Sequence, residues 1–186
     1  MITPFLSTLG LVLLAEFGDK TQICALTLSL RYRKTYSVVL GAAFGFLLVD
    51  ALAVIAGSLL LEFIPLSWIK IVGGFIFIAF GAYYFIKKDE EYCLTNNNRT
   101  PFISSFILIS TTEMGDKTQI MVALLSAIYS NPLAVISGAL IALVGLTAVT
   151  VIVGNRLLDR VPLKKIRRIT PFVFIILGIL QIAFSQ

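Results

Sequence analysis

Two stretches of the chain carry the same charged phrase inside apolar surroundings. The first is AEFGDKTQICALTLS, from Ala15 to Ser29, and the second is TEMGDKTQIMVALLS, from Thr112 to Ser126. Each places a glutamate, an aspartate and a lysine close together. An ionisable side chain in the middle of a membrane helix costs roughly 2.5–3.5 kcal/mol on insertion scales. Two such clusters therefore indicate a site that binds something charged, facing inward to a wet or ligand-filled cavity.

The carboxylates of the two phrases are the candidate metal ligands, and two lysines accompany them: Glu16, Asp19, Glu113 and Asp116, with Lys20 and Lys117. Four carboxylates and two ammonium groups leave a formal charge of −2 when all are ionised, which one divalent cation or two protons would neutralise. The chain has no histidine. Oxygen ligands alone favour hard cations, Ca²⁺, Mn²⁺ or Mg²⁺, over Zn²⁺ or Cu⁺.

Neutral oxygens beside the acids could support the site or line the path to it: Thr21, Thr118, Gln22 and Gln119. On a continuous helix Glu16, Asp19 and Lys20 share one face, and Gly18 lies nearly opposite, where it would let a second helix approach. Thr21 and Gln22 lie off the acidic face. They reach the site only if the helix is distorted or if they face another helix.

Two structural alternatives remain open at this stage. Glu16 and Lys20 have the i,i+4 spacing of a local ion pair, although that pair would leave Asp19 without a partner. Asp50, in the middle of the next apolar segment, is either a proton acceptor, the counter-charge of Lys20 or Lys117, or one half of a structural ion pair. If Asp50 is ionised, the formal charge of the cluster becomes −3.

Composition defines the environment of these residues. The 186 residues are 58% hydrophobic and only 13% charged, with a mean hydropathy of +0.97, which is typical of an integral membrane protein and not of a soluble domain. We attribute the net charge of +5 to basic residues in the loops, which set the orientation of the helices in the membrane. The expected partner is therefore the lipid bilayer and not a nucleic acid. Cys24 and Cys93 lie far apart without a CxxC pattern, so neither a disulfide nor a zinc site is expected.

A bilayer core of about 30 Å needs about 20 apolar residues in a helix. On this scale six apolar segments are candidate spans: Phe5–Leu30, Tyr36–Leu61, Leu66–Ile86, Phe102–Ile128, Pro132–Gly154 and Ile169–Phe184. The first and the fourth, which contain the charged phrases, are longer than needed. We therefore expect these two segments to tilt, bend or contain an unwound stretch.

The chain is an internal duplication with an offset of 97 residues. When Phe5–Ala82 is laid over Phe102–Ile179, 29 of 78 positions are identical, and glycines and prolines keep their register as well as the charged phrase. We therefore divide the chain into a first three-helix repeat (1–86), a polar linker (87–101) and a second three-helix repeat (102–186).

Three spans per repeat place the second repeat upside down relative to the first. Basic residues gather in the loops after the first, third and fifth spans, and the opposite side has only Lys70. The positive-inside rule then puts both termini outside and the linker in the cytoplasm. The predicted fold is an all-α membrane protein of six transmembrane helices in a 3+3 inverted repeat, an architecture of transporters with their site near the midplane.

Acidic groups that bind either protons or a metal ion are the chemical core of a cation/proton antiporter, because a bound cation displaces the protons. A passive divalent-cation channel is the main alternative, since acidic rings also select cations; the buried lysines argue against a continuous file of ions. We expect no enzyme activity, because the spans lack the GxGD pattern of an intramembrane aspartyl protease and an Arg or His for a lipid-pyrophosphate phosphatase.

The paired motif, EFGDKT at Glu16–Thr21 and EMGDKT at Glu113–Thr118 in six spans, resembles the GDT family of cation/proton exchangers, also called uncharacterised protein family 0016. The resemblance covers nearly the whole chain. It implies Ca²⁺/Mn²⁺–proton exchange, a metal-binding role for the four carboxylates and supporting roles for Lys20, Lys117, Thr21 and Thr118. Mn²⁺ or Ca²⁺ would be transported, with no cofactor permanently bound.

Longer eukaryotic members of that family carry targeting sequences and longer linkers that are missing from this sequence. The expected location is therefore a prokaryotic plasma membrane, with metal exported from the cytoplasm as protons enter. Sequence alone leaves Mn²⁺ versus Ca²⁺, the stoichiometry and the oligomeric state open, a homo-oligomer included.

Overall fold

The structure, a computed structural model, describes residues 2–86, 100–157 and 170–183, and every regular element in these ranges is a helix. The helices are α1 (Ile2–Glu16), α2 (Lys20–Tyr32), α3 (Thr35–Phe63), α4 (Leu66–Ile86), α5 (Pro101–Glu113), α6 (Lys117–Tyr129), α7 (Pro132–Leu157) and α9 (Thr170–Ala183). The predicted all-α class is thus confirmed for the described part of the chain. The predicted linker, 87–101, lies almost entirely outside it.

Two helices are long and apolar enough to cross a membrane. They cover Thr35–Leu59 in α3 and Pro132–Ile152 in α7, close to the second and fifth predicted spans. The pair α1 and α2 counts as a third span if the two helices, bent by 73° at the break between them, cross together. The described part of the chain therefore supports two or three spans by length and composition.

Each of the two overlong predicted spans consists of two helices. The segment Phe5–Leu30 forms α1 and α2, and Phe102–Ile128 forms α5 and α6, with the charged phrase at the break in both cases. The expectation of a bend or an unwound stretch is confirmed. The break is the feature that positions the site.

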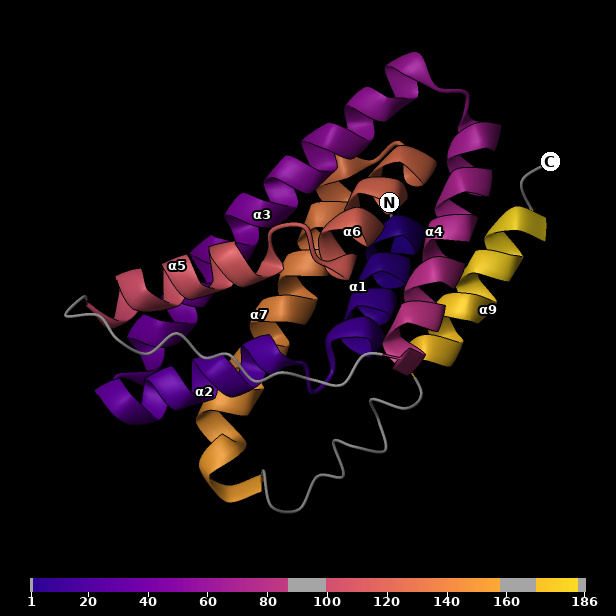
Figure 1. Cartoon of the computed structure of the whole chain (residues 1–186). Helices are drawn as coiled ribbons and strands as arrows, with labels where there is room; N and C mark the ends of the chain where they lie inside the picture. The colour runs from indigo at the N-terminus through magenta and orange to yellow at the C-terminus, as the bar shows by residue number, and fades with distance from the viewer. Residues whose placement is uncertain (1, 87–99, 158–169, 184–186) are drawn as a thin grey trace.

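The long helix α3 packs along both α5 and α6, α7 packs on α1 and α3, and α4 lies side by side with α9 (Figure 1). Side chains from α1, α3, α5, α6 and α7 share one apolar core that includes Val12, Phe46, Ile109, Met121 and Val135. The outer face of α3 exposes large apolar side chains such as Phe44, Leu52 and Ile55. An apolar exterior around a buried Asp50 is the arrangement expected in lipid.

Two glycines allow the long helices to approach the half-helices closely, with equivalent contacts in the two repeats. Gly41 of α3 lies against the backbone of Phe102 and against Ser105 in α5, and Gly138 of α7 lies against Phe5 and Thr8 in α1. At the offset of 97 residues, Gly41 is equivalent to Gly138, and Phe102 and Ser105 are equivalent to Phe5 and Thr8. The same contact therefore occurs twice, once with the glycine in each repeat. Each half therefore contacts the other through the same surface.

We predict that Gly138→Ala lowers the thermal stability of the purified protein in detergent. A Cβ atom there would lie 2.6 Å from the carbonyl oxygen of Phe5, so α1 and α7 must separate, at a cost of about 1–3 kcal/mol. Gly145→Ala in the same helix is the matched control, because its Cβ would meet nothing within 4 Å. Equal unfolding temperatures for the two variants would contradict the packing described above.

A smaller apolar cluster lies beside the first charged phrase. It joins Cys24, Ala25 and Leu28 of α2 to Val38 of α3 and Leu108 of α5. Cys24 is buried and disulfide-bonded. The expectation of an unpaired thiol at this position is therefore wrong, because sequence spacing does not report which segments meet in space.

Candidate cation-binding site

The charged phrases form tight turns between half-helices. Helix α1 ends at Glu16 and α2 begins at Lys20, and the backbone N–H of Asp19 donates to the carbonyl of Glu16 (3.1 Å). Gly18 between them has φ of 74°, in the left-handed region that glycine adopts without strain. The turn therefore frees Glu16 and Asp19 from a single helical face.

The second phrase repeats this turn with the same geometry. The N–H of Asp116 donates to the carbonyl of Glu113 (3.1 Å), and Gly115 has φ of 79°. A Cβ on Gly115 would meet nothing within 4 Å, so this glycine serves the backbone turn. The prediction of one continuous helical face, with the motif glycine as a helix-packing contact, is wrong because the backbone is not helical at the glycine.

The motif glutamines hold these turns. The N–H of Gly18 donates to Gln22 Oε1 (3.2 Å), and the N–H of Gly115 donates to Gln119 Oε1 (2.5 Å). Gln22 also donates from Nε2 to the carbonyl of Glu16 (2.6 Å) and accepts from Thr150 of α7 (3.3 Å). Gln22 and Gln119 thus support the site through its backbone; a direct role toward a cation stays a prediction. The contribution of Thr150 carried no sequence signal.

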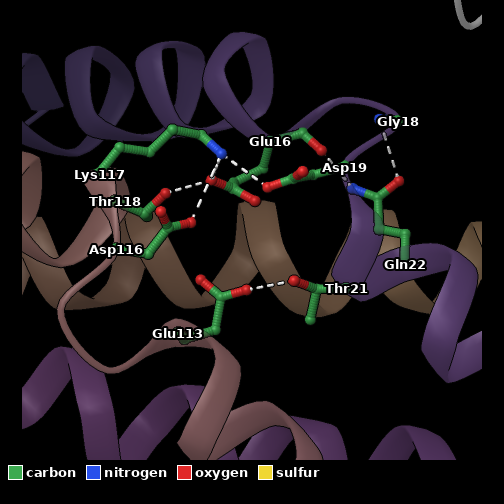
Figure 2. A network of polar contacts seen from close by, with 9 residues as sticks. All are labelled: Glu16, Gly18, Asp19, Thr21, Gln22, Glu113, Asp116, Lys117 and Thr118. Atoms are coloured by element: carbon green, nitrogen blue, oxygen red, sulfur yellow. Dashed lines mark hydrogen bonds and ion pairs between the residues drawn. The ribbon is translucent and has the colours of Figure 1, made fainter. Parts of the chain in front are cut away.

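The two motif copies bond to each other through a reciprocal pair of hydrogen bonds (Figure 2). Thr21 Oγ1 donates to Glu113 Oε1 (2.6 Å), and its equivalent, Thr118 Oγ1, donates to Glu16 Oε1. All four side chains are buried. The broken helices turn the threonines toward the opposite copy. The sequence predicted that Thr21 would reach the site only if its helix were distorted, and the break is such a distortion.

Lys117 lies at the centre of three carboxylates. Its Nζ is 2.9 Å from Glu16 Oε1, 2.6 Å from Asp19 Oδ2 and 3.6 Å from Asp116 Oδ2, and its side chain is only 2% exposed. Glu16 is therefore paired across the two copies. The side chain of Lys20, the local partner considered for Glu16, lies outside the described residues.

Glu16, Asp19 and Asp116 form a group that could hold a metal ion, with one carboxylate oxygen from each within 4.8 Å of the others. Three hard oxygen ligands from both copies suit a divalent cation of the Mn²⁺ or Ca²⁺ type. The structure thus brings three of the four predicted ligands together. Glu113 is adjacent, bonded to Thr21, and is not one of the three (Figure 2).

Asp50 is the remaining candidate. It lies in α3, is 2% exposed, and its Oδ2 has no hydrogen-bond partner among the described residues. Its equivalent in the second repeat, Thr147 of α7, is 1% exposed. The two repeats therefore differ in charge next to the motif.

We predict that Gly115→Ala weakens Mn²⁺ binding and lowers the unfolding temperature. Because the space around the new Cβ is open, the effect comes from the left-handed backbone alone, about 1–2 kcal/mol. Relief of that strain moves Asp116 relative to Glu16. Gly145→Ala, also in open space but within α7, serves as the control; unchanged Mn²⁺ affinity and stability in Gly115→Ala would show that the turn is not required.

The sequence matches the family described as divalent cation/proton antiporter GDT1 over residues 4–92 and 101–185. The chain belongs to this family. GDT1 proteins are a transporter family, which agrees with the buried carboxylates in an apolar helical protein and with the resemblance noted in the sequence. Both copies of the motif in this chain, Glu16–Thr21 and Glu113–Thr118, lie within the matched residues and form the two turns that meet in the structure.

Two GDT1 relatives align with most of this chain. A Vibrio cholerae protein named "Putative manganese exporter" is 33% identical over 174 residues, 90% of this chain and 84% of the relative. A GDT1-like protein of Synechocystis is 26% identical over 203 residues, 97% of each chain. GDT1-like protein 3 of Arabidopsis thaliana is 36% identical over 81 residues, 43% of this chain and 27% of the relative. No solved structure matches the chain.

Proposed function

We propose that this GDT1 family member is a secondary active transporter that exchanges a divalent cation, Mn²⁺ or Ca²⁺, for protons and exports the metal from the cytoplasm. The observation that carries the proposal is the convergence of carboxylates from both motif copies around one buried ammonium group. In this proposal the metal-binding oxygens come from the carboxylates of both copies, Glu16, Asp19, Asp116 and Glu113.

Six spans in a 3+3 inverted repeat, with both termini outside, are the architecture that this mechanism needs. The reciprocal bonds of Thr21 with Glu113 and of Thr118 with Glu16 support it, since equivalent residues that exchange roles are typical of two-fold relations. Helices broken at a buried site are likewise typical of transporters with inverted repeats. Movement of one repeat against the other would then open the site to each side in turn.

Lys117 supports exchange over simple binding. Its ammonium group lies among the three carboxylates that would coordinate the metal, so the lysine and the divalent cation repel each other at short range. Metal entry therefore requires Lys117 to move or to lose its proton, and metal release lets it return. The carboxylates in turn lose protons when metal binds.

The ligand chemistry and the relatives bear on which ion is carried. Oxygen ligands suit both Mn²⁺ and Ca²⁺. The name of the Vibrio cholerae relative, "Putative manganese exporter", favours Mn²⁺ here, and its bacterial source favours a prokaryotic cell membrane, which the chain would cross several times. Export of metal would use the inward proton gradient.

A passive cation channel is the alternative, and uphill flux separates the two. Purified protein in proteoliposomes is loaded at acidic pH, the membrane potential is clamped with K⁺ and valinomycin, and the vesicles are diluted into alkaline buffer with Mn²⁺. We expect Mn²⁺ to accumulate above its external concentration while protons leave, and to redistribute when a protonophore is added. Entry that stops at equal concentrations would contradict exchange and favour the channel.

A further inference from the structure

Two buried polar atoms near the second motif copy have no hydrogen-bond partner among the described residues. They are Oδ2 of Asp50, in α3, and Oγ of Ser110, in α5. Their side chains are 2% and 8% exposed. Buried oxygens without a partner are unusual in folded proteins and point to a group that they bind.

The packing of α3 places Asp50 at the level of the α5–α6 turn. Gly45 of α3 lies against Ile109 of α5, and Gly57 lies against Ala123 of α6. Asp50 comes between these two contacts, as the turn comes between Ile109 and Ala123. Asp50 also precedes Gly57 by seven residues, two helical turns, and so shares the face that packs on α6.

Glu113 is the charged group that acts on Asp50 electrostatically. Ser110 comes three residues before Glu113 in α5, so the two side chains are neighbours on that helix. Glu113 in turn accepts the hydrogen bond from Thr21. The packing of α3 and the helical spacing in α5 therefore place Asp50, Glu113 and Ser110 beside the second motif copy. Figure 2 shows Glu113 bonded to Thr21, away from the ion pairs of Lys117.

This arrangement has no counterpart around the first motif copy. The equivalents of Asp50 and Ser110 are Thr147 and Leu13, so only Glu16 is acidic there. Glu16 has the ammonium group of Lys117 at 2.9 Å, whereas Asp50 and Glu113 have no ion pair among the described residues, and Lys117 acts on Glu113 only from a longer distance. Two neighbouring buried carboxylates repel each other when both are ionised, and a cation bound between them would relieve this repulsion.

We propose that Asp50, Glu113 and Ser110 form a second divalent-cation position, next to the position of Glu16, Asp19 and Asp116 but separate from it. The inference rests on the proposed function, because it assigns this second position to the same transported ion. The chain would then hold two hard cations at saturation, one on each side of the reciprocal threonine–glutamate bonds.

Equilibrium dialysis of the purified protein against Mn²⁺ tests this proposal. We expect two Mn²⁺ per chain in the wild type and one in Asp50→Thr. This variant has at position 50 the residue that the second repeat has at the equivalent position, Thr147. Asp50→Asn keeps the shape of the side chain and is expected to bind one Mn²⁺ as well. Ser110→Ala should weaken the second Mn²⁺ about tenfold and leave the first within about threefold. Glu16→Gln should retain the ion that depends on Asp50.

One Mn²⁺ per wild-type chain, or two in both Asp50 variants, would overturn the second position. One Mn²⁺ per wild-type chain is also the result expected if Asp50 forms an ion pair with Lys20 and binds no metal. Variants that keep the wild-type elution volume and helical circular dichroism are taken as folded. If Asp50→Thr does not fold, Asp50→Asn provides the test. Uphill Mn²⁺ transport by the wild type is measured separately: if it occurs with one bound ion, only the second position fails, and if it is absent, the proposed function fails.

Discussion

Glu16→Gln is expected to abolish measurable Mn²⁺–proton exchange and to weaken Mn²⁺ binding at the three-carboxylate group by about 10- to 100-fold. Glutamine has the shape of glutamate and can still accept the hydrogen bond of Thr118, so the bond between the two copies can be kept, and the turn is held by the backbone carbonyl of Glu16, which the change leaves in place. What is lost is one of three charged ligands and its bond to Lys117. Charge-assisted interactions contribute about 1.5–3 kcal/mol each, and 1.4 kcal/mol corresponds to a factor of ten.

The Glu16→Gln experiment uses Mn²⁺ uptake by proteoliposomes under an imposed pH gradient, with binding measured on the same preparation. Thr27→Val is the control in the same segment, because the Thr27 hydroxyl is exposed and bonds only the carbonyl of Ile23 in its own helix. We expect wild-type uptake from Thr27→Val. Uptake by Glu16→Gln at the wild-type rate would remove Glu16 from the transport mechanism.

Lys117→Met is expected to destabilise the protein in the absence of metal and to make its stability depend on Mn²⁺. Lys117 neutralises Glu16 and Asp19 at 2.9 and 2.6 Å; Lys117 and Glu16 are buried, and Asp19 is half-buried. Removal of one partner from a buried charge cluster costs about 3–5 kcal/mol. A divalent cation can replace the lost ammonium group, so saturating Mn²⁺ should restore most of the unfolding temperature.

Thermal unfolding in detergent, with and without Mn²⁺, measures both effects. Lys70→Met is the control: Lys70 is a half-buried lysine of α4, which is not one of the four motif half-helices. We expect a small change in its unfolding temperature and the wild-type response to Mn²⁺. If Lys117→Met has the same unfolding temperature as the wild type and no larger Mn²⁺ response, Lys117 is not the counter-charge of the carboxylates.

The sequence predicts the membrane class, the duplication and the ligand set because these depend on composition and register. The excess length of Phe5–Leu30 and Phe102–Ile128 also predicted that these segments tilt, bend or contain an unwound stretch, and the structure shows a break in each. The duplication predicted that the two acidic clusters have a common role, and the structure joins them through Thr21 and Thr118. These signals are local or periodic, and a single sequence preserves them.

The geometry of the motif was not predictable in the same way. A helical periodicity treats Gly18 as one more helical position, whereas its positive φ ends α1 and starts a new direction. The pairing of Glu16 with Lys117 follows from contacts between segments 97 residues apart. Likewise, the Oδ2 of Asp50 has no hydrogen-bond partner among the described residues because of what α5 and α6 present to α3, and no spacing within α3 encodes that.

The central claim is that aspartates from the two motif copies bind one and the same cation. A double-mutant cycle of Mn²⁺ affinity with Asp19→Asn and Asp116→Asn tests it most directly, because one residue comes from each copy. We expect each change to weaken Mn²⁺ binding about tenfold or more and their effects to be coupled by about 0.5–3 kcal/mol. Effects that add to within about 0.5 kcal/mol would mean that the two copies act on separate ions, and the account would be contradicted.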